Sequence, residues 1–109
     1  MDRSELLALR RQALNEKAQI DKERLDAHRK IVDLLYKDDE QSRIVRAQAL
    51  GQIEKWERNH LCHPRYVVMW RQWLSMPASF AKAAILREDD LGVSMRQNSP
   101  FDQAVVALV

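Results

Sequence analysis

The sequence predicts an all-α fold. In it a long N-terminal helical hairpin, at about 4–36 and 39–59, packs with two or three shorter helices, at about 64–75, 77–88 and 100–108. Two observations carry this prediction. The 109 residues include only two glycines and three prolines, fewer than a glycine-rich phosphate loop or a many-turned β-sandwich requires. Apolar residues also recur at helical spacing along most of the chain. At this length we expect one domain, residues 1–109.

The first helix is predicted by a run of fifty residues that contains neither Gly nor Pro. Ser4 is a candidate N-cap for it. Charged and amide side chains occupy one face, and apolar side chains recur every seven residues on the other. The repeating apolar residues are Leu6, Ala13, Ile20, Ala27 and Leu34. This pattern is typical of a long amphipathic helix.

The second helix follows a short polar turn whose aspartates can cap it, at residues 37–40. Val45, Ala49, Ile53 and Trp56 line one of its faces. So short a connection predicts an antiparallel hairpin. Gly51 lies inside this helix, where we expect another helix or an indole ring to approach closely.

The shorter helices are predicted from proline positions and apolar runs. Pro64 suits the first turn of a helix that is apolar over most of its circumference, and Pro77 opens the next. Residues 88–98 are expected to be irregular because they contain Gly92 and polar residues. The Ser99–Asp102 segment has the pattern of a capping box and predicts a last helix.

Composition limits the cellular setting. Eighteen Lys and Arg against sixteen Asp and Glu give a net charge of +2, too small to imply a polyanionic partner. A single cysteine, Cys62, cannot form an internal disulfide, which favours a reducing cytoplasm. The charged first twenty residues do not resemble a signal peptide, and apolar runs such as Tyr66–Trp70 are far shorter than the ~20 residues that span a bilayer. We therefore expect a cytoplasmic protein that does not enter a membrane.

The lengths of the first two helices predict a partner. A helix of roughly 33 residues is about 50 Å long, and one of roughly 20 residues covers only about 30 Å of it. Residues 1–20 should therefore overhang, for contact with another copy or another protein. Alternatively, the C-terminal helices fold back over this end. The residues predicted to form the protein interface are Leu6, Leu7, Leu14, Trp56, Trp70, Trp73 and Phe101.

The chemistry of the side chains predicts neither an enzyme nor a metal site. His60, Cys62 and His63 lie close together, but a structural zinc site needs a fourth ligand, and His28 is far away on the first helix. Cys62 has neighbouring histidines without a motif that would orient them for nucleophilic catalysis. We expect no cofactor and no small-molecule substrate.

A nucleic-acid-binding protein is the alternative interpretation. No acidic residue occurs in 58–87, and aromatic residues lie among the basic ones, as in surfaces that bind single strands. The basic residues are Arg58, Arg65, Arg71, Lys82 and Arg87. A simpler explanation of the missing acidic residues is that the third and fourth helices form the core, which excludes acids.

A second nucleic-acid signal is local. Leu91-Gly92-Val93-Ser94 resembles the turn of a helix-turn-helix, but Pro100 would break the recognition helix that such a motif requires.

Taken together, these patterns favour a non-enzymatic interaction or regulatory protein of the antitoxin, anti-defence or adaptor type. It would self-associate or bind a protein partner.

Overall fold

The computed structural model describes residues 2–101, and this part of the chain contains five helices and no strand. The helices are α1 (Arg3–Leu35), α2 (Glu40–Asn59), α3 (Pro64–Ser75), α4 (Ala78–Ile85) and α5 (Asp90–Gln97). The all-α fold class, with a long N-terminal helix packed against shorter ones, is confirmed. The helix expected at about 100–108 falls outside the described residues except for Pro100 and Phe101, which form a turn.

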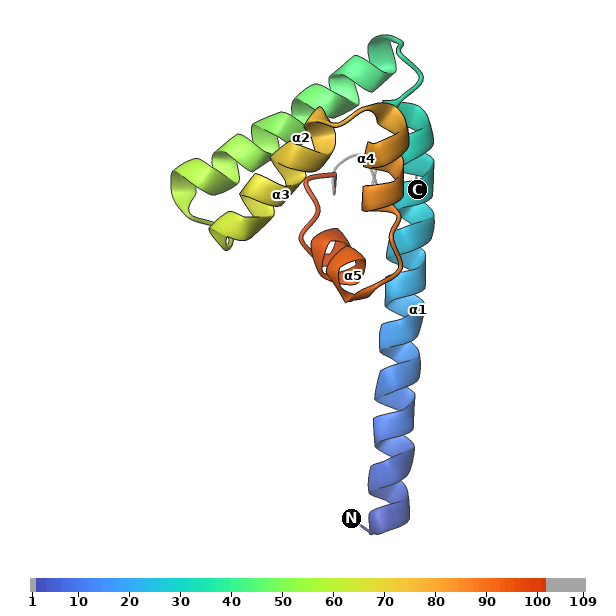
Figure 1. The fold of residues 1–109 in the computed structure, drawn as a ribbon. Helices are drawn as coiled ribbons and strands as arrows, with labels where there is room; N and C mark the ends of the chain where they lie inside the picture. The colour runs from blue at the N-terminus through green and yellow to red at the C-terminus, as the bar shows by residue number, and fades with distance from the viewer. Residues whose placement is uncertain (1, 102–109) are drawn as a thin grey trace.

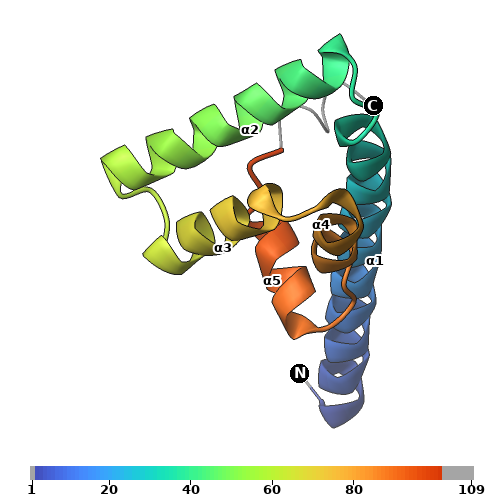
Figure 2. The ribbon, with the colours of Figure 1, turned by 45° about the horizontal axis from the view of Figure 1, so that its top comes forward.

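The helices are arranged as a wedge (Figures 1 and 2). α1 is one continuous rod, and α2 leaves its C-terminal end at a sharp corner and diverges from it. α3 runs back beside α2, while α4 and α5 pack on α1 and on each other. α1 and α2 therefore diverge instead of lying side by side, because the three short helices occupy the space between them.

The start of α1 is fixed by an aspartate. Asp2 accepts a hydrogen bond from the Glu5 amide at 2.8 Å, which satisfies an amide that has no partner within the helix. The N-cap is thus Asp2 instead of the expected Ser4, because the helix already begins at Arg3.

The next two helices begin as the sequence predicts. Asp39 accepts from the Ser42 amide at 2.8 Å, and the Ser42 hydroxyl oxygen accepts from the Asp39 amide at 2.9 Å, which forms a capping box. His63 is extended ahead of Pro64, and its Nδ1 accepts from the Arg65 amide at 3.1 Å. Both helix starts are therefore encoded by local sequence.

The core lies where the short helices meet the second half of α1. Every helix supplies at least one fully or nearly fully buried apolar side chain to it, and burying each such side chain contributes roughly 1.5–3 kcal/mol. Among the larger apolar side chains, the most deeply buried are Ile31, Val32, Ile53, Trp70, Ile85, Met95 and Phe101. The first buried residue along α1 is Leu25, so the helix enters the core only in its second half.

The aromatic centre of the core corrects one prediction. Trp70 meets Trp73 and Phe101 edge to face, with ring centroids 5.3 and 5.7 Å apart, and its indole N–H donates to the Asn98 carbonyl at 2.9 Å. Trp70, Trp73 and Phe101 were expected at a partner interface, yet they are only 0%, 4% and 1% exposed. They stabilise the core, because the apolar circumference of α3 turns inward and the polar atom of Trp70 is satisfied internally.

A buried histidine joins the second half of α1 to the segment after α5. His28 Nδ1 lies 2.6 Å from the Arg24 carbonyl, which can only accept, so this nitrogen carries the proton. Its Nε2 therefore accepts from the Ser99 hydroxyl at 2.7 Å, and the Ser99 oxygen accepts from the Phe101 amide at 3.2 Å. Every atom of this chain of hydrogen bonds has its role fixed when the imidazole is neutral.

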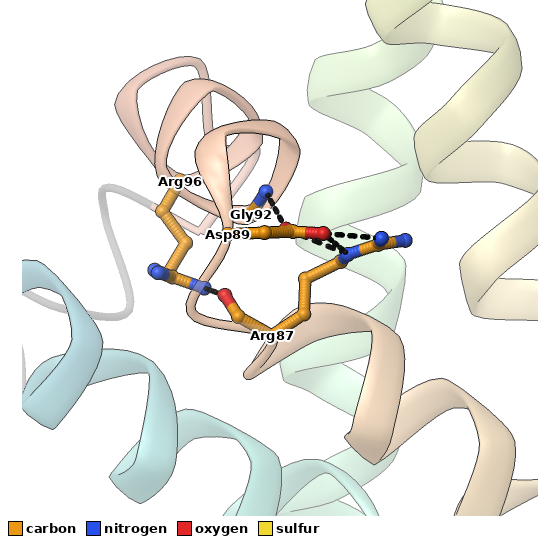
Figure 3. A network of polar contacts seen from close by, with 4 residues as sticks. All are labelled: Arg87, Asp89, Gly92 and Arg96. Atoms are coloured by element: carbon orange, nitrogen blue, oxygen red, sulfur yellow. Dashed lines mark hydrogen bonds and ion pairs between the residues drawn. The ribbon is translucent and has the colours of Figure 1, made fainter.

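The stretch 88–98, expected to be irregular, forms α5 instead. Asp89 begins this helix by accepting from the Gly92 amide at 3.0 Å, and it also pairs with the Arg87 guanidinium (Figure 3). Gly92 is buried in the first turn, where a Cβ would lie 2.8 Å from the Arg87 carbonyl carbon and still nearer its oxygen. The glycine lies inside α5 and permits a close approach to the Arg87 backbone just before this helix. It is not the turn of a helix-turn-helix.

A side chain of α5 caps the C-terminal end of α4. Arg96, only 4% exposed, donates to the carbonyl oxygens of Ile85 at 2.9 Å and Arg87 at 2.7 Å (Figure 3 shows the second). The Ile85 carbonyl is the last of α4 and the Arg87 carbonyl lies two residues beyond it, where no helical amide follows to satisfy them. This contact explains why α4 ends at Ile85, earlier than the predicted 88.

Gly51 does not mark a close approach, contrary to expectation. No atom lies within 4 Å of the position that its Cβ would take, and the residue is exposed. The missing side chain is therefore not required by packing.

The two glycines predict opposite effects on stability. Gly92→Ala should lower the free energy of unfolding by about 1–3 kcal/mol or more, because the new methyl group overlaps backbone atoms. Gly51→Ala should raise it by about 0.5–1 kcal/mol, because alanine favours a helix interior. Urea denaturation of both variants measures these changes. A Gly92→Ala variant as stable as the parent chain would contradict the close approach.

His28 predicts a loss of stability in mild acid. Burial, together with the Arg96 and Arg24 charges, lowers the pKa of His28 from 6.5 to about 4 in the folded chain. The unfolded chain therefore takes up the proton first, and stability falls as the pH drops from about 6.5 towards 4, by about 3 kcal/mol in total. Denaturation at a series of pH values should show this slope, and His28→Gln should flatten it. Equal slopes in the two proteins would refute the assignment.

Candidate protein interface

Residues 2–20, which are the N-cap and the first part of α1, extend beyond the other helices and are called the arm (Figure 1). Residues 21–101 are called the body. Every residue of the arm is exposed. The molecule measures 56 × 29 × 24 Å along its principal axes, and the arm accounts for much of the long dimension. The large apolar side chains exposed along the arm are Leu6, Leu7, Leu9, Leu14 and Ile20.

The arm is helical without tertiary contacts for local reasons. Its first turn is capped by Asp2. On its polar face Gln12 donates to Glu16 at 3.2 Å and Gln19 donates to Glu23 at 3.1 Å, pairs that each contribute about 0.2–0.5 kcal/mol. The costly first turn of a helix is also already formed, because the arm continues the packed half of α1.

The arm presents the same face of α1 that the body covers. Leu7 and Leu14 belong to one row of residues spaced by seven, and further along this row His28 and Leu35 are buried. The row that begins at Leu6 likewise ends at the buried Leu34. The arm face, defined by Leu6, Leu7 and Leu14, thus continues the packed face of α1 beyond the body.

A basic row lies between these two apolar rows. Arg3, Arg10, Lys17 and Arg24 are also spaced by seven residues. Arg24 is paired with Asp21 at 3.7 Å, whereas no ion pair of Arg3, Arg10 or Lys17 is found within residues 2–101. This row was not predicted, although its spacing in the sequence was the signal that could have revealed it.

Trp56, also predicted at the interface, occupies a different place. It is half-buried on α2 and packs against the edge of the core. It lies near the end of α2, and α2 diverges from α1 towards that end (Figure 1), so the structure does not bring this part of α2 to the arm.

Two of the predicted nucleic-acid-binding residues are paired with acids. Arg71 donates to Glu57 at 2.6 Å, and Arg87 pairs with Asp89. Both acids lie just outside the acid-free stretch 58–87, so the stretch is not acid-free in space. These pairings reduce the charge available to a phosphate backbone.

The remaining basic residues are dispersed. Arg65 lies over the Tyr66 ring at 5.0 Å and Lys82 over the Tyr36 ring at 5.7 Å. Arg65 and Arg71 are six positions apart on α3, which turns them about 120° away from each other. Arg58 is exposed near the end of α2.

The histidine and cysteine corner serves helix ends. His60 adopts a left-handed conformation with φ 53° where α2 ends, and His63 caps α3. Burial raises the pKa of the Cys62 thiol, which disfavours the nucleophilic thiolate. Within residues 2–101 no group of three or more His, Cys, Asp or Glu side chains is placed to hold a metal ion. The same part of the chain has no helix long and apolar enough to cross a bilayer.

The contrast between arm and body predicts a contrast in hydrogen exchange. In the isolated protein, amides of residues 7–20 should exchange more than about 100-fold faster than those of residues 28–35, because opening the arm breaks no tertiary contact. Exchange measured by NMR or mass spectrometry, corrected for the intrinsic rate of each amide, tests this within one helix. Equal protection along α1 would mean that something already covers the arm.

No protein-family model matches this chain, and no curated protein or solved structure is significantly similar to it.

Proposed function

We propose that this chain is a non-enzymatic interaction protein whose arm binds protein, either a second copy or a different partner. The observation that supports the proposal is the uninterrupted continuation of the packed face of α1 into an exposed arm. Leu14 is 67% exposed there and Leu7 51%. Repeated leucines on a rigid helix match the helix-in-groove and helix-on-helix modes of recognition.

The finer identity rests on size and build. A small helical protein with a protruding interaction helix suits a regulator of the antitoxin, anti-defence or adaptor type, acting in the cytoplasm. This part of the proposal is an analogy of architecture. Nucleic-acid binding through residues 58–87 is the weaker candidate, because Arg71 and Arg87 are engaged by carboxylates.

Site-specific photo-crosslinking tests the proposal in the cells that make the protein. A photo-reactive amino acid replaces Leu14, or in a matched control Gln12, which lies about 160° further round the same exposed helix. Leu14 should give a discrete crosslinked adduct and Gln12 should not, because only the arm face is covered. The mass of the adduct distinguishes a second copy from another protein.

The expected dependence on packing provides a second criterion. Adding Leu7→Glu should abolish the adduct at position 14, because a carboxylate cannot be buried without a partner. The absence of any adduct at position 14, or equal adducts at both positions, would contradict the proposed function.

A further inference from the structure

We infer that the arm face receives a protein partner whose contact surface combines apolar side chains with carboxylates, such as an acidic amphipathic helix. The inference rests on the proposed function and specifies the chemistry of the partner. It follows from the side chains that accompany the leucines on that face.

The charge of the arm face has one sign. The basic row of Arg3, Arg10 and Lys17 runs between the row that starts at Leu6 and the row of Leu7 and Leu14. Successive positions on a helix turn by about 100°, which places these six side chains within roughly 120° of arc. No acidic residue falls inside this arc between positions 3 and 17.

The acids of the arm lie elsewhere and are engaged locally. Asp2 caps the helix, and Glu16 accepts from Gln12 on the polar face. Glu5 lies about 140° from the centre of the basic row. The arm therefore separates its charges: basic and apolar side chains share the face that continues into the core, and acids face away.

A partner that covers the leucines must also meet these cations. Burying a leucine row around an unpaired guanidinium or ammonium group is unfavourable, because the charge loses its water. Carboxylates on the partner would restore the lost interaction and, with Arg, form two parallel hydrogen bonds. The chemistry that covers the apolar rows is therefore apolar and acidic together.

A second copy does not supply that chemistry. If two arms met by this face, parallel or antiparallel, the basic rows would oppose each other at the centre of the contact. A pairing rotated towards the row of Leu6, Ala13 and Ile20 would leave Leu7 and Leu14 in water and place the small Ala13 at the seam. The arm face is thus better suited to a different, acidic protein.

The test uses two synthetic helical peptides of about three heptads, both with Leu at positions a and d. One carries Glu at e and g, and the other carries Lys there. The full chain should bind the Glu peptide at least about tenfold more tightly than the Lys peptide at low salt, as measured by fluorescence anisotropy, and salt should narrow the difference.

Charge-matched variants locate the effect on the helix. Arg10→Glu with Lys17→Glu should weaken binding of the Glu peptide at least about tenfold. Lys22→Glu with Lys30→Glu makes the same change in net charge, but these exposed residues lie about 120° and 160° round the helix from Arg10, so binding should change little. Circular dichroism of both variants confirms that α1 remains helical.

Three outcomes would overturn the inference. The first is equal binding of the two peptides, or equal loss in the two double variants, since net charge alone would then explain the attraction. The second is a dimer by light scattering that Leu7→Glu with Leu14→Glu dissociates, which would make a second copy the occupant. The third is binding to phosphatidylserine vesicles without binding to the Glu peptide. A position-14 adduct of a different protein would still support the proposed function in the first case.

Discussion

The structure depends on a mismatch in length: α1 is one helix, but the other helices pack on only its second half. From Leu25 onward its apolar side chains are buried by the other helices, and Ile31 and Val32 are almost completely withdrawn from water. This packed half supplies the folding energy and fixes the helical conformation. The arm inherits that conformation, because extending an existing helix by one residue costs far less than starting a new one. An exposed, preformed binding element is thus a direct consequence of where the body ends.

The sequence predicted the helices whose signals are local. The breaker-free first fifty residues and the proline at position 64 predicted α1 and α3 almost to the residue, and the aspartates of the turn at 37–40 indicated the start of α2. α5 was missed because Gly92 was treated as a helix breaker. In the fold it is the one residue small enough to lie against the Arg87 carbonyl, and that requirement depends on the path of α4. A glycine needed for close approach cannot be told from a glycine that ends a helix until the neighbouring element is placed.

The candidate interface was predictable only in part, for a similar reason. Helical periodicity placed Leu6, Leu7 and Leu14 on one face, and the length of the helix indicated that the face would lack intramolecular cover. Periodicity could not show that Trp70, Trp73 and Phe101 point towards one another. An aromatic row predicts burial, but it does not say whether a partner or the chain itself provides it. The ion pairs of Arg71 and Arg87 were not predicted, because the acids that form them lie just beyond the acid-free stretch 58–87.

The least predictable contact gives the arm its direction. His28 and Ser99 are 71 positions apart, and no local pattern pairs them, yet their hydrogen bond attaches the segment after α5 to α1. Phe101 then packs edge to face on both His28 and Trp70, which joins α1 to α3. Because α1 is continuous from this junction to the arm, the arm is held as a rigid extension of the body. A partner bound to the arm is therefore set at a defined orientation to the body, as a helical spacer does and a flexible linker does not. The body then has a part in recognition beyond stability: it fixes where the partner lies.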